Sequence, residues 1–316
     1  MFSRRLLRVK VLQILYAYHK VEGKPYTSTE KDLLYSLEKS YELYHLLLLL
    51  IVDVLDYAES RIIQAREKRM PTEQDLNPNT RFIKNQAVEQ LRNNSQFKSY
   101  LAKHPLSWVK YPEIVRKLFA YIADAEFYAN YMNHKEPSYR EDKRIIEQIY
   151  TDIVMNYEDL YLNLEEQSIF WVDDVDYIIR MIVKTLKRFS QIDKEGAALI
   201  PMFKENDDLD YAKTLLRKTI INEKDCLELI KKAANNWELE RIAFTDNLIL
   251  QLAISEAMEF PSIPVKVTIN EFIEIAKLYS THKSSQFING ILDNVIAGLR
   301  RDGKIVKKGR GLIGEI

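Results

Sequence analysis

The chain has 316 residues, of which 47% are apolar and 29% charged, a mix that excludes a disordered chain and is typical of a globular protein. Only four of its eight glycines precede residue 300, too few for the hairpin turns of a sheet protein of this size, so we expect an all-α fold. The 46 Lys and Arg balance the 46 Asp and Glu, but residues 1–20 carry five basic residues and no acidic one, and residues 300–316 carry six against two. Either an anionic partner binds these ends or they only keep the protein in solution, and charge alone does not decide.

Cysteine content and hydropathy exclude two further classes of protein. The single cysteine, Cys226, excludes an internal disulfide and any metal site built from several cysteines. The longest apolar stretch, residues 46–52, is far shorter than the roughly 20 residues that cross a bilayer. The N-terminus lacks the pattern of a signal peptide. We therefore expect a cytoplasmic protein that does not contact a membrane.

Helical patterns begin near the N-terminus and follow one another with short breaks. The first covers residues 3–20, and a long helix or helix pair then reaches Arg69. A polar linker between Pro71 and Pro78 follows. Further helices are expected at residues 80–103, 112–133, 138–165 and 168–189 and, after a loop at 190–208, at 209–220, 223–235, 245–259, 268–279 and 284–299. Residues 300–316 combine basic residues with half of all the glycines, which predicts a flexible basic tail that packs against nothing.

Motifs for catalysis or cofactor binding are absent from the sequence. It holds no HExxH, CxxC, GxSxG or Walker-type motif. Residues 309–314 match GxGxxG in form, but they lack the strand before and the helix after that a dinucleotide site needs. The five histidines are scattered without ligand spacing. We predict no catalytic residue, no cofactor and no metal, although a site assembled from distant residues is left open.

Two stretches near the C-terminus carry the clearest pattern. Residues 263–277, IPVKVTINEFIEIAK, and residues 287–293, FINGILD, resemble the signature of the NusB family, close to PxKVAINEAxExAK followed by FVNGVLD. The spacing matches without gaps. At the other end, residues 4–16 resemble the basic first helix of the family. The resemblance covers residues 1–20 and about 209–299, and leaves out roughly 140 residues between them.

The same stretches can also be interpreted from their residues alone. Thr268 and Glu271 have the spacing of a capping box, which predicts that a helix starts at residue 268. Gly290 in mid-helix costs about 1 kcal/mol relative to alanine, so we expect another backbone to approach closely there. A buried amide needs hydrogen-bond partners, which favours a structural role over an RNA contact for Asn289.

The first helix offers a surface for RNA. Residues 7, 11, 14 and 18 form the stripe that faces the core, and Arg4, Arg5, Arg8 and Tyr16 fall on an adjoining face. Arginine binds phosphate through a two-point fork, and tyrosine stacks on an unpaired base. A solvated basic face is the alternative, and composition alone favours it. The resemblance reverses that preference, because NusB-like proteins use this helix to hold RNA.

The resemblance implies a fold of paired helical bundles, here with extra inserted helices. It implies a transcription antitermination factor that binds boxA-type RNA of nascent ribosomal transcripts together with NusE, a small-subunit ribosomal protein, on the RNA polymerase elongation complex. The expected RNA-binding residues are Arg4, Arg5, Arg8, Tyr16, Phe287 and Asn289. Gln286 stands where family members often carry a basic residue, which weakens the case for a backbone contact there.

Two alternatives belong to other classes. One is the NusB-like region of an rRNA methyltransferase system, although the chain has no Gly-rich cofactor domain. The other is a helical scaffold that has lost RNA binding. For the domains we expect N-terminal NusB-like helices at residues 1–70, a helical insertion at 71–208, C-terminal NusB-like helices at 209–299 and the tail at 300–316.

Overall fold

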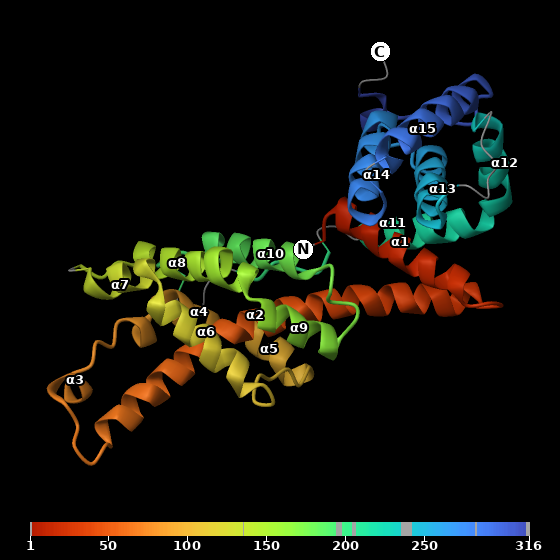
Figure 1. Cartoon of the computed structure of the whole chain (residues 1–316). Helices are drawn as coiled ribbons and strands as arrows, with labels where there is room; N and C mark the ends of the chain where they lie inside the picture. The colour runs from red at the N-terminus through yellow and green to blue at the C-terminus, as the bar shows by residue number, and fades with distance from the viewer. Residues whose placement is uncertain are drawn as a thin grey trace. The chain divides into compact units, whose positions relative to one another are not determined.

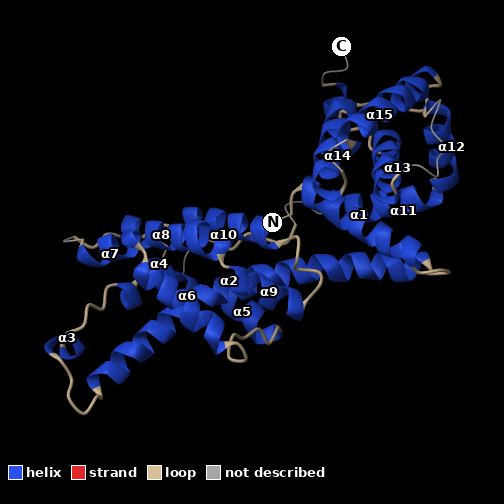
Figure 2. Ribbon diagram, in the orientation of Figure 1, coloured by secondary structure: helices blue, strands red, loops and turns tan. Residues whose placement is uncertain are grey.

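The computed structural model describes residues 2–134, 136–193, 198–203, 207–234, 242–281 and 283–313, and in these ranges it contains helices and no strand (Figure 2). This confirms the expected all-α class. The α-helices are α1 (Arg4–Lys20), α2 (Tyr26–Arg66), α3 (Glu73–Leu76), α4 (Gln86–Asn93), α5 (Ser95–Lys103), α6 (Pro112–Asp124), α7 (Glu126–Asn133), α8 (Tyr139–Gln148), α9 (Glu158–Gln167), α10 (Val175–Arg188), α11 (Asp207–Ile221), α12 (Glu223–Ala233), α13 (Phe244–Glu259), α14 (Val265–Tyr279) and α15 (Ser284–Arg301). Short 3-10 segments lie at Phe82–Lys84, Val154–Asn156 and Gly309–Leu312, and a π-helical turn at Ile149–Ile153.

The chain divides into two compact units. Unit 1 comprises Met1–Leu37 and Met202–Ile316, and unit 2 comprises Glu38–Pro201. These limits differ from the expected ones at residues 70 and 208. The observed boundary between Leu37 and Glu38 lies inside α2, which runs through 41 residues without a break (Figure 1). A boundary inside a continuous helix leaves no proline, glycine or change of composition that a reading of the sequence can detect.

Unit 1 is built around α13. Residues 248–257 of this helix are buried on every side, because α1, α11, α12, α14 and α15 all pack against it or against one another (Figure 1). Leu7, Val11 and Ile14 of α1 face this core as expected, whereas Tyr18 is only half-buried. Ile288, Leu292 and the other apolar residues of the α15 stripe are buried too.

Unit 2 packs smaller helices along the second part of α2. The side chains of Trp108, Tyr150 and Trp171 donate hydrogen bonds to carbonyl groups of α2, at Leu46 (3.0 Å), Leu47 (2.7 Å) and Lys39 (2.8 Å). Three of the expected helical ranges are each divided here. In the first of them the Asn94 side chain accepts from Phe97 N (3.0 Å), which ends α4 and begins α5. None of the described helices is long and apolar enough to cross a membrane.

The expected start of α14 is wrong by three residues. The helix begins at Val265, directly after Pro264, and its first turn has no side-chain cap. Thr268 is fully buried, and its hydroxyl donates to Glu256 Oε1 (2.7 Å) instead of capping the helix. Glu271 accepts hydrogen bonds from α1. Two residues that look like a local pair therefore join α14 to two other helices, α13 through Thr268 and α1 through Glu271.

The structure also contradicts the close approach expected at Gly290. A Cβ atom placed there meets no atom within 4 Å, and the residue is exposed. Replacing Gly290 by alanine should therefore raise the free energy of unfolding by about 1 kcal/mol, because alanine loses less backbone freedom in a helix. Urea denaturation of the variant tests this, and a fall in stability would reveal packing at Gly290 that the structure does not show.

Residues 303–313 are not the unattached tail that we expected. Ile305 and Lys307 are buried, and Lys308 N donates to Pro261 O (3.0 Å). The amine of Lys307 donates to the carbonyls of Ala257 (2.8 Å) and Phe260 (3.0 Å) at the end of α13. Ala257 lies in the last turn of α13, whose carbonyls have no partner within the helix. The segment therefore completes the core of unit 1; residues 314–316 lie outside the described ranges.

Candidate nucleic-acid interface

The three arginines of the predicted RNA face lie at the N-terminal end of α1, and each is paired with a carboxylate. Arg4 Nε lies 3.0 Å from Asp208 Oδ1. Arg5 donates to both oxygens of Glu271, at 2.9 and 2.8 Å, and Arg8 lies 3.5 Å from the same carboxylate. The structure thus brings the arginines together, but not as a free basic patch.

Arg8 belongs to the core. Only 3% of its side chain is exposed, and its guanidinium donates to both oxygens of the fully buried Glu256, at 2.7 and 2.9 Å. The hydroxyls of Tyr211 and Thr268 donate to the same carboxylate. Burial, and then the charge of Glu256, raises the pKa of Tyr211 well above its usual value, which keeps this donor protonated. The guanidinium of Arg8, which we predicted to contact RNA, is thus enclosed and engaged by two carboxylates, and in this structure it offers RNA almost no surface.

Arg4 and Arg5 keep a partly exposed surface. Their side chains are 37% and 52% exposed, and the Arg4 guanidinium also lies 4.3 Å above the ring of Tyr211. The hydrogen bond from Arg5 lowers the pKa of Glu271. Exposed ion pairs of this kind contribute little to stability and weaken with salt. A phosphate group can therefore compete with Glu271 for Arg5.

Tyr16 lies in an aromatic cluster at the other end of α1. It is 41% exposed and meets Phe244 of α13, 38% exposed, edge to face with 5.3 Å between ring centroids. The Lys20 amine lies 4.4 Å from the centroid of Phe244 and 5.2 Å from that of Tyr16, and the His19 ring lies 6.0 Å from Phe244. We name these four residues the Tyr16 cluster. Two exposed rings beside a cation are the elements that bind unpaired bases and their phosphates.

The Tyr16 cluster and the arginines form two separate spots. Arg5 and Tyr16 are eleven residues apart on α1, which places them roughly 16 Å apart along the helix axis. Arg8 and Leu12, which lie between them on this face, are buried. A strand of RNA that contacts both spots must therefore cross a covered stretch of α1.

Phe287 and Asn289 lie in the first part of α15 and are half-buried. We expected the Asn289 amide to be buried in the core. It is not, and it donates instead to Asp293 Oδ2 (3.1 Å), one turn further along the helix surface. A structural hydrogen bond therefore exists, but it is local to α15. Whether these two residues bind RNA stays a prediction.

Three members of the Tyr16 cluster, His19, Lys20 and Phe244, were not among the RNA-binding residues predicted from the sequence. Lys20 lies four residues after Tyr16, and helical spacing alone predicts that the two side chains are neighbours. Phe244 carries no such signal, because only the packing of α13 on α1 brings it beside Tyr16. Phe244 is thus the one member of the cluster that only the tertiary fold brings to α1.

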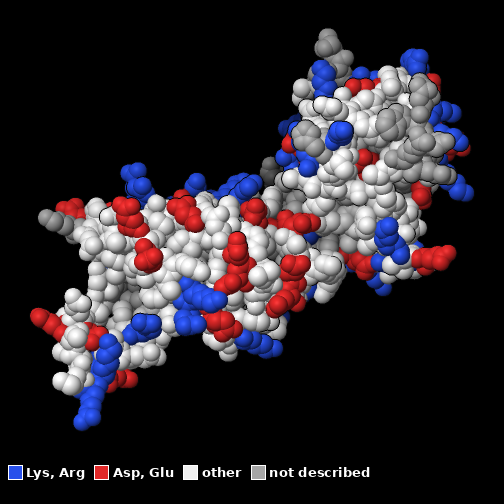
Figure 3. Space-filling view, in the orientation of Figure 1, with Lys and Arg blue, Asp and Glu red and all other residues white. Residues whose placement is uncertain are grey.

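The two units carry opposite net charges. Unit 1 has 24 Lys and Arg against 20 Asp and Glu, a net charge of +4, and unit 2 has 22 against 26, a net charge of −4. In Figure 3, basic side chains are prominent along the rim of unit 1, around α12, α14 and α15. The exposed basic residues of these helices are Lys224, Lys231, Lys232, Lys266, Lys277, Arg300 and Arg301, and the exposed Lys283 directly precedes α15. This excess is modest, so unit 1 by itself neutralises few phosphates.

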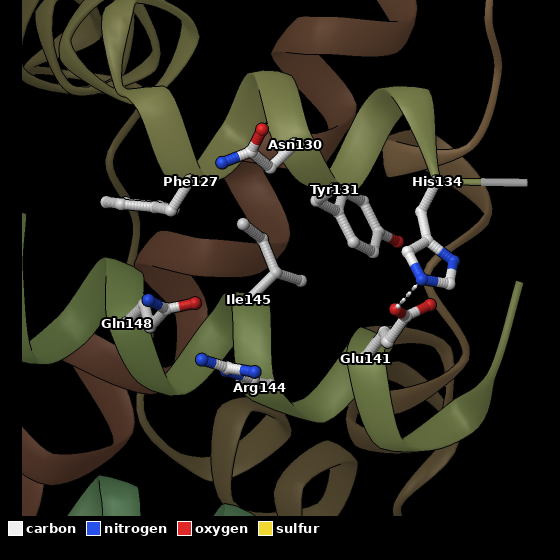
Figure 4. A pocket seen from close by; sticks show the side chains of 8 residues that line it. All are labelled: Phe127, Asn130, Tyr131, His134, Glu141, Arg144, Ile145 and Gln148. Carbon is white, nitrogen blue, oxygen red and sulfur yellow. Dashed lines mark ion pairs between the residues drawn. The ribbon is translucent and has the colours of Figure 1, made fainter.

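A pocket of about 390 Å³ lies between α7 and α8 of unit 2 (Figure 4). His134 Nε2 lies 3.0 Å from Glu141 Oε1, and Arg81, outside the lining, pairs with the other oxygen of Glu141 (2.6 Å). The lining holds no serine, threonine or cysteine. Among the described residues, no group of three or more His, Cys, Asp or Glu can hold a metal ion. That the chain is not an enzyme stays a prediction.

Comparison with known proteins gives one consistent family. The model of the NusB family matches residues 180–297. The transcription antitermination protein NusB of Salinibacter ruber is 37% identical over 139 residues, 42% of this chain and 87% of that protein. The NusB proteins of Chloroherpeton thalassium (40% over 128 residues, 40% of this chain and 61% of that protein) and Natranaerobius thermophilus (40% over 114 residues, 35% and 82%) are similar. The solved structure of T. maritima NusB shares 24% identity and covers 54% of this chain and 98% of that chain, with a TM-score of 0.30.

Proposed function

This chain belongs to the NusB family, and we propose that its unit 1 acts as a transcription antitermination factor that binds boxA-type single-stranded RNA of nascent ribosomal transcripts. It acts by binding, without a catalytic step. The observation that supports RNA binding most directly is the Tyr16 cluster, where two exposed rings and the Lys20 amine lie together. Arg5, Phe287 and Asn289 are further candidate contacts.

NusE is the partner that this proposal requires. With a net charge of +4 and the three arginines of α1 engaged in ion pairs, unit 1 should bind RNA weakly on its own. A second RNA-binding protein on the same transcript raises the effective concentration of RNA and so the affinity of the pair. The pair would then act on the RNA polymerase elongation complex.

Replacing Tyr16 and Phe244 together by alanine should weaken binding of a boxA-type oligonucleotide by about tenfold, because stacking on aromatic rings contributes about 1–3 kcal/mol per base. Replacing Lys20 by glutamine should lower the slope of log affinity against log salt by about 0.7, the single-strand value for one phosphate contact. Fluorescence anisotropy titrations, with and without NusE, measure both.

Tyr35→Ala is the control for these variants, because Tyr35 is a comparably exposed tyrosine (48%) of unit 1 outside the cluster. It should bind RNA like the unchanged protein. If the folded Tyr16/Phe244 variant keeps its affinity both with and without NusE, the cluster is not an RNA site. A chain that binds no RNA under either condition is instead a helical scaffold.

A further inference from the structure

Unit 2, most of which lies outside the family match, contains a basic groove that no part of the proposed function uses. The groove, about 470 Å³ in volume, runs between α2 and α6. Arg61 enters it from α2, and Arg116 and Lys117 enter it from α6. We propose that this groove is a second binding site for single-stranded RNA, additional to the Tyr16 cluster of unit 1.

The positive charge of the groove is available for a ligand. Arg61, Arg116 and Lys117 are all exposed. No ion pair among the described residues involves either arginine, whereas Lys117 pairs with Asp159 at 2.6 Å, with both side chains at least 40% exposed. The two guanidiniums lie on different helices and have no ion-pair partner in the described part of the chain, and each can bind a phosphate through two parallel hydrogen bonds. Since unit 2 is net acidic, this basic site is local.

Aromatic rings form the inner wall of the groove. Tyr57 and Phe119 meet edge to face with 5.6 Å between their centroids, and both are half-buried. Ala120 and Ala123 of α6 also line the groove, and their small side chains take up little of its space. Rings beside arginines in a groove lined by small side chains suit the stacking of a base next to its phosphate.

The site is longer than a single nucleotide. Arg61 and Phe119 also line an adjoining hollow of about 240 Å³. There the half-buried Tyr128 adds a ring, and the fully buried Phe82 packs against it and against Phe119, with 5.2 and 6.4 Å between ring centroids. Gln74 adds an exposed amide that can bond to the edge of a base. Two linked hollows with shared cationic and aromatic residues fit a strand better than a free phosphate.

An acidic peptide is the competing ligand, because it too would be attracted by the arginines. The half-buried rings of Tyr57, Phe119 and Tyr128 favour RNA, since carboxylate side chains gain nothing from stacking. Asp124 also lines the groove, and its carboxylate repels nearby phosphates and carboxylates alike, so this repulsion does not separate the two ligands. For RNA the same carboxylate can accept a hydrogen bond from a ribose 2′-hydroxyl.

The test uses the full chain and an oligouridylate that carries 5-iodouridine. Arg61→Gln combined with Arg116→Gln should weaken binding by about tenfold and lower the salt slope by about 1.4, or 0.7 for each lost phosphate contact. The matched control is Arg140→Gln with Arg180→Gln, which removes the same charge from exposed positions of unit 2 outside the groove and should leave affinity nearly unchanged. Photo-cross-linking should yield modified peptides that contain Tyr57 or Phe119.

This design separates the groove from the Tyr16 cluster. Cross-links at Tyr57 or Phe119 that persist when Tyr16 and Phe244 are replaced by alanine support the groove even if the proposed function of unit 1 fails. Equal affinities of the groove and control variants, with no cross-link in α2 or α6, overturn the proposal. So does a groove that binds polyglutamate in an Arg61-dependent way but not the oligouridylate, because its ligand would then be an acidic peptide.

Discussion

Replacement of Arg8 by alanine should lower the free energy of unfolding of unit 1 by about 3–5 kcal/mol, the usual cost of removing one partner of a buried ion pair. The reason is that Glu256, with no exposed surface, loses both hydrogen bonds from the guanidinium and keeps only those from Tyr211 and Thr268. Hydrogen exchange followed by mass spectrometry, read on peptides of α1 and α13, assigns the loss to unit 1. Urea denaturation gives its size.

Two further variants separate charge from geometry at this site. Arg8→Lys keeps the positive charge but loses the planar fork, so it should be destabilised by a smaller amount. Arg8→Met combined with Glu256→Met should recover much of the loss, because apolar pairs of similar volume often replace buried ion pairs without cost. If Arg8→Ala unfolds like the unchanged protein but binds RNA less well, Arg8 acts as an RNA contact and not as part of the core.

The sequence of α13, and not that of α1, indicates that one arginine is buried. Helical spacing placed Arg8 beside Arg4 and Arg5, and nothing within residues 1–20 distinguishes the three. Glu256, however, is an acidic residue within a helix that is otherwise apolar from residue 248 to 257 apart from Gln251 and Ser255. A carboxylate in a helix buried on all sides requires a cation. The arginine that supplies it, 248 residues away, can be identified only from the fold.

The fold class and most helices were predictable, whereas the site was predictable only in part. Helix periodicity and the scarcity of glycine can be seen in the sequence without knowledge of the tertiary contacts, and they predicted the all-α class correctly. The pairing of Tyr16 with Phe244 and the groove between α2 and α6 depend on helices that meet through tertiary packing. The limits of the units were missed for a related reason, since α2 passes from one unit to the other without an interruption.

Deletion of residues 303–316 should destabilise unit 1 by about 3 kcal/mol or more, whereas the sequence alone predicts almost no change. The basic, Gly-rich composition suggests mobility, but Gly303 has a positive φ of 67° that turns the chain back after α15. The deletion removes the buried Ile305 and the Lys307 amine, which donates to two carbonyls at the end of α13. Hydrogen bonds that involve a charged group contribute about 1.5–3 kcal/mol each. Urea denaturation of the truncated chain measures the loss.

Single substitutions show which contact of this segment matters. Lys307→Met keeps an apolar stem and loses the two bonds, so it should reproduce much of the effect of the deletion, whereas Lys304→Gln removes the same charge from an exposed position and should be nearly neutral. Gly311→Ala should also destabilise unit 1, because a Cβ atom there would lie 1.9 Å from the carbonyl oxygen of Pro261. If the truncated protein instead unfolds like the full chain, residues 303–316 form the flexible tail that the composition predicts. A truncated protein that keeps its stability but loses its preference for boxA-type RNA would make these residues, and not α1, the place where the sequence of the RNA is recognised.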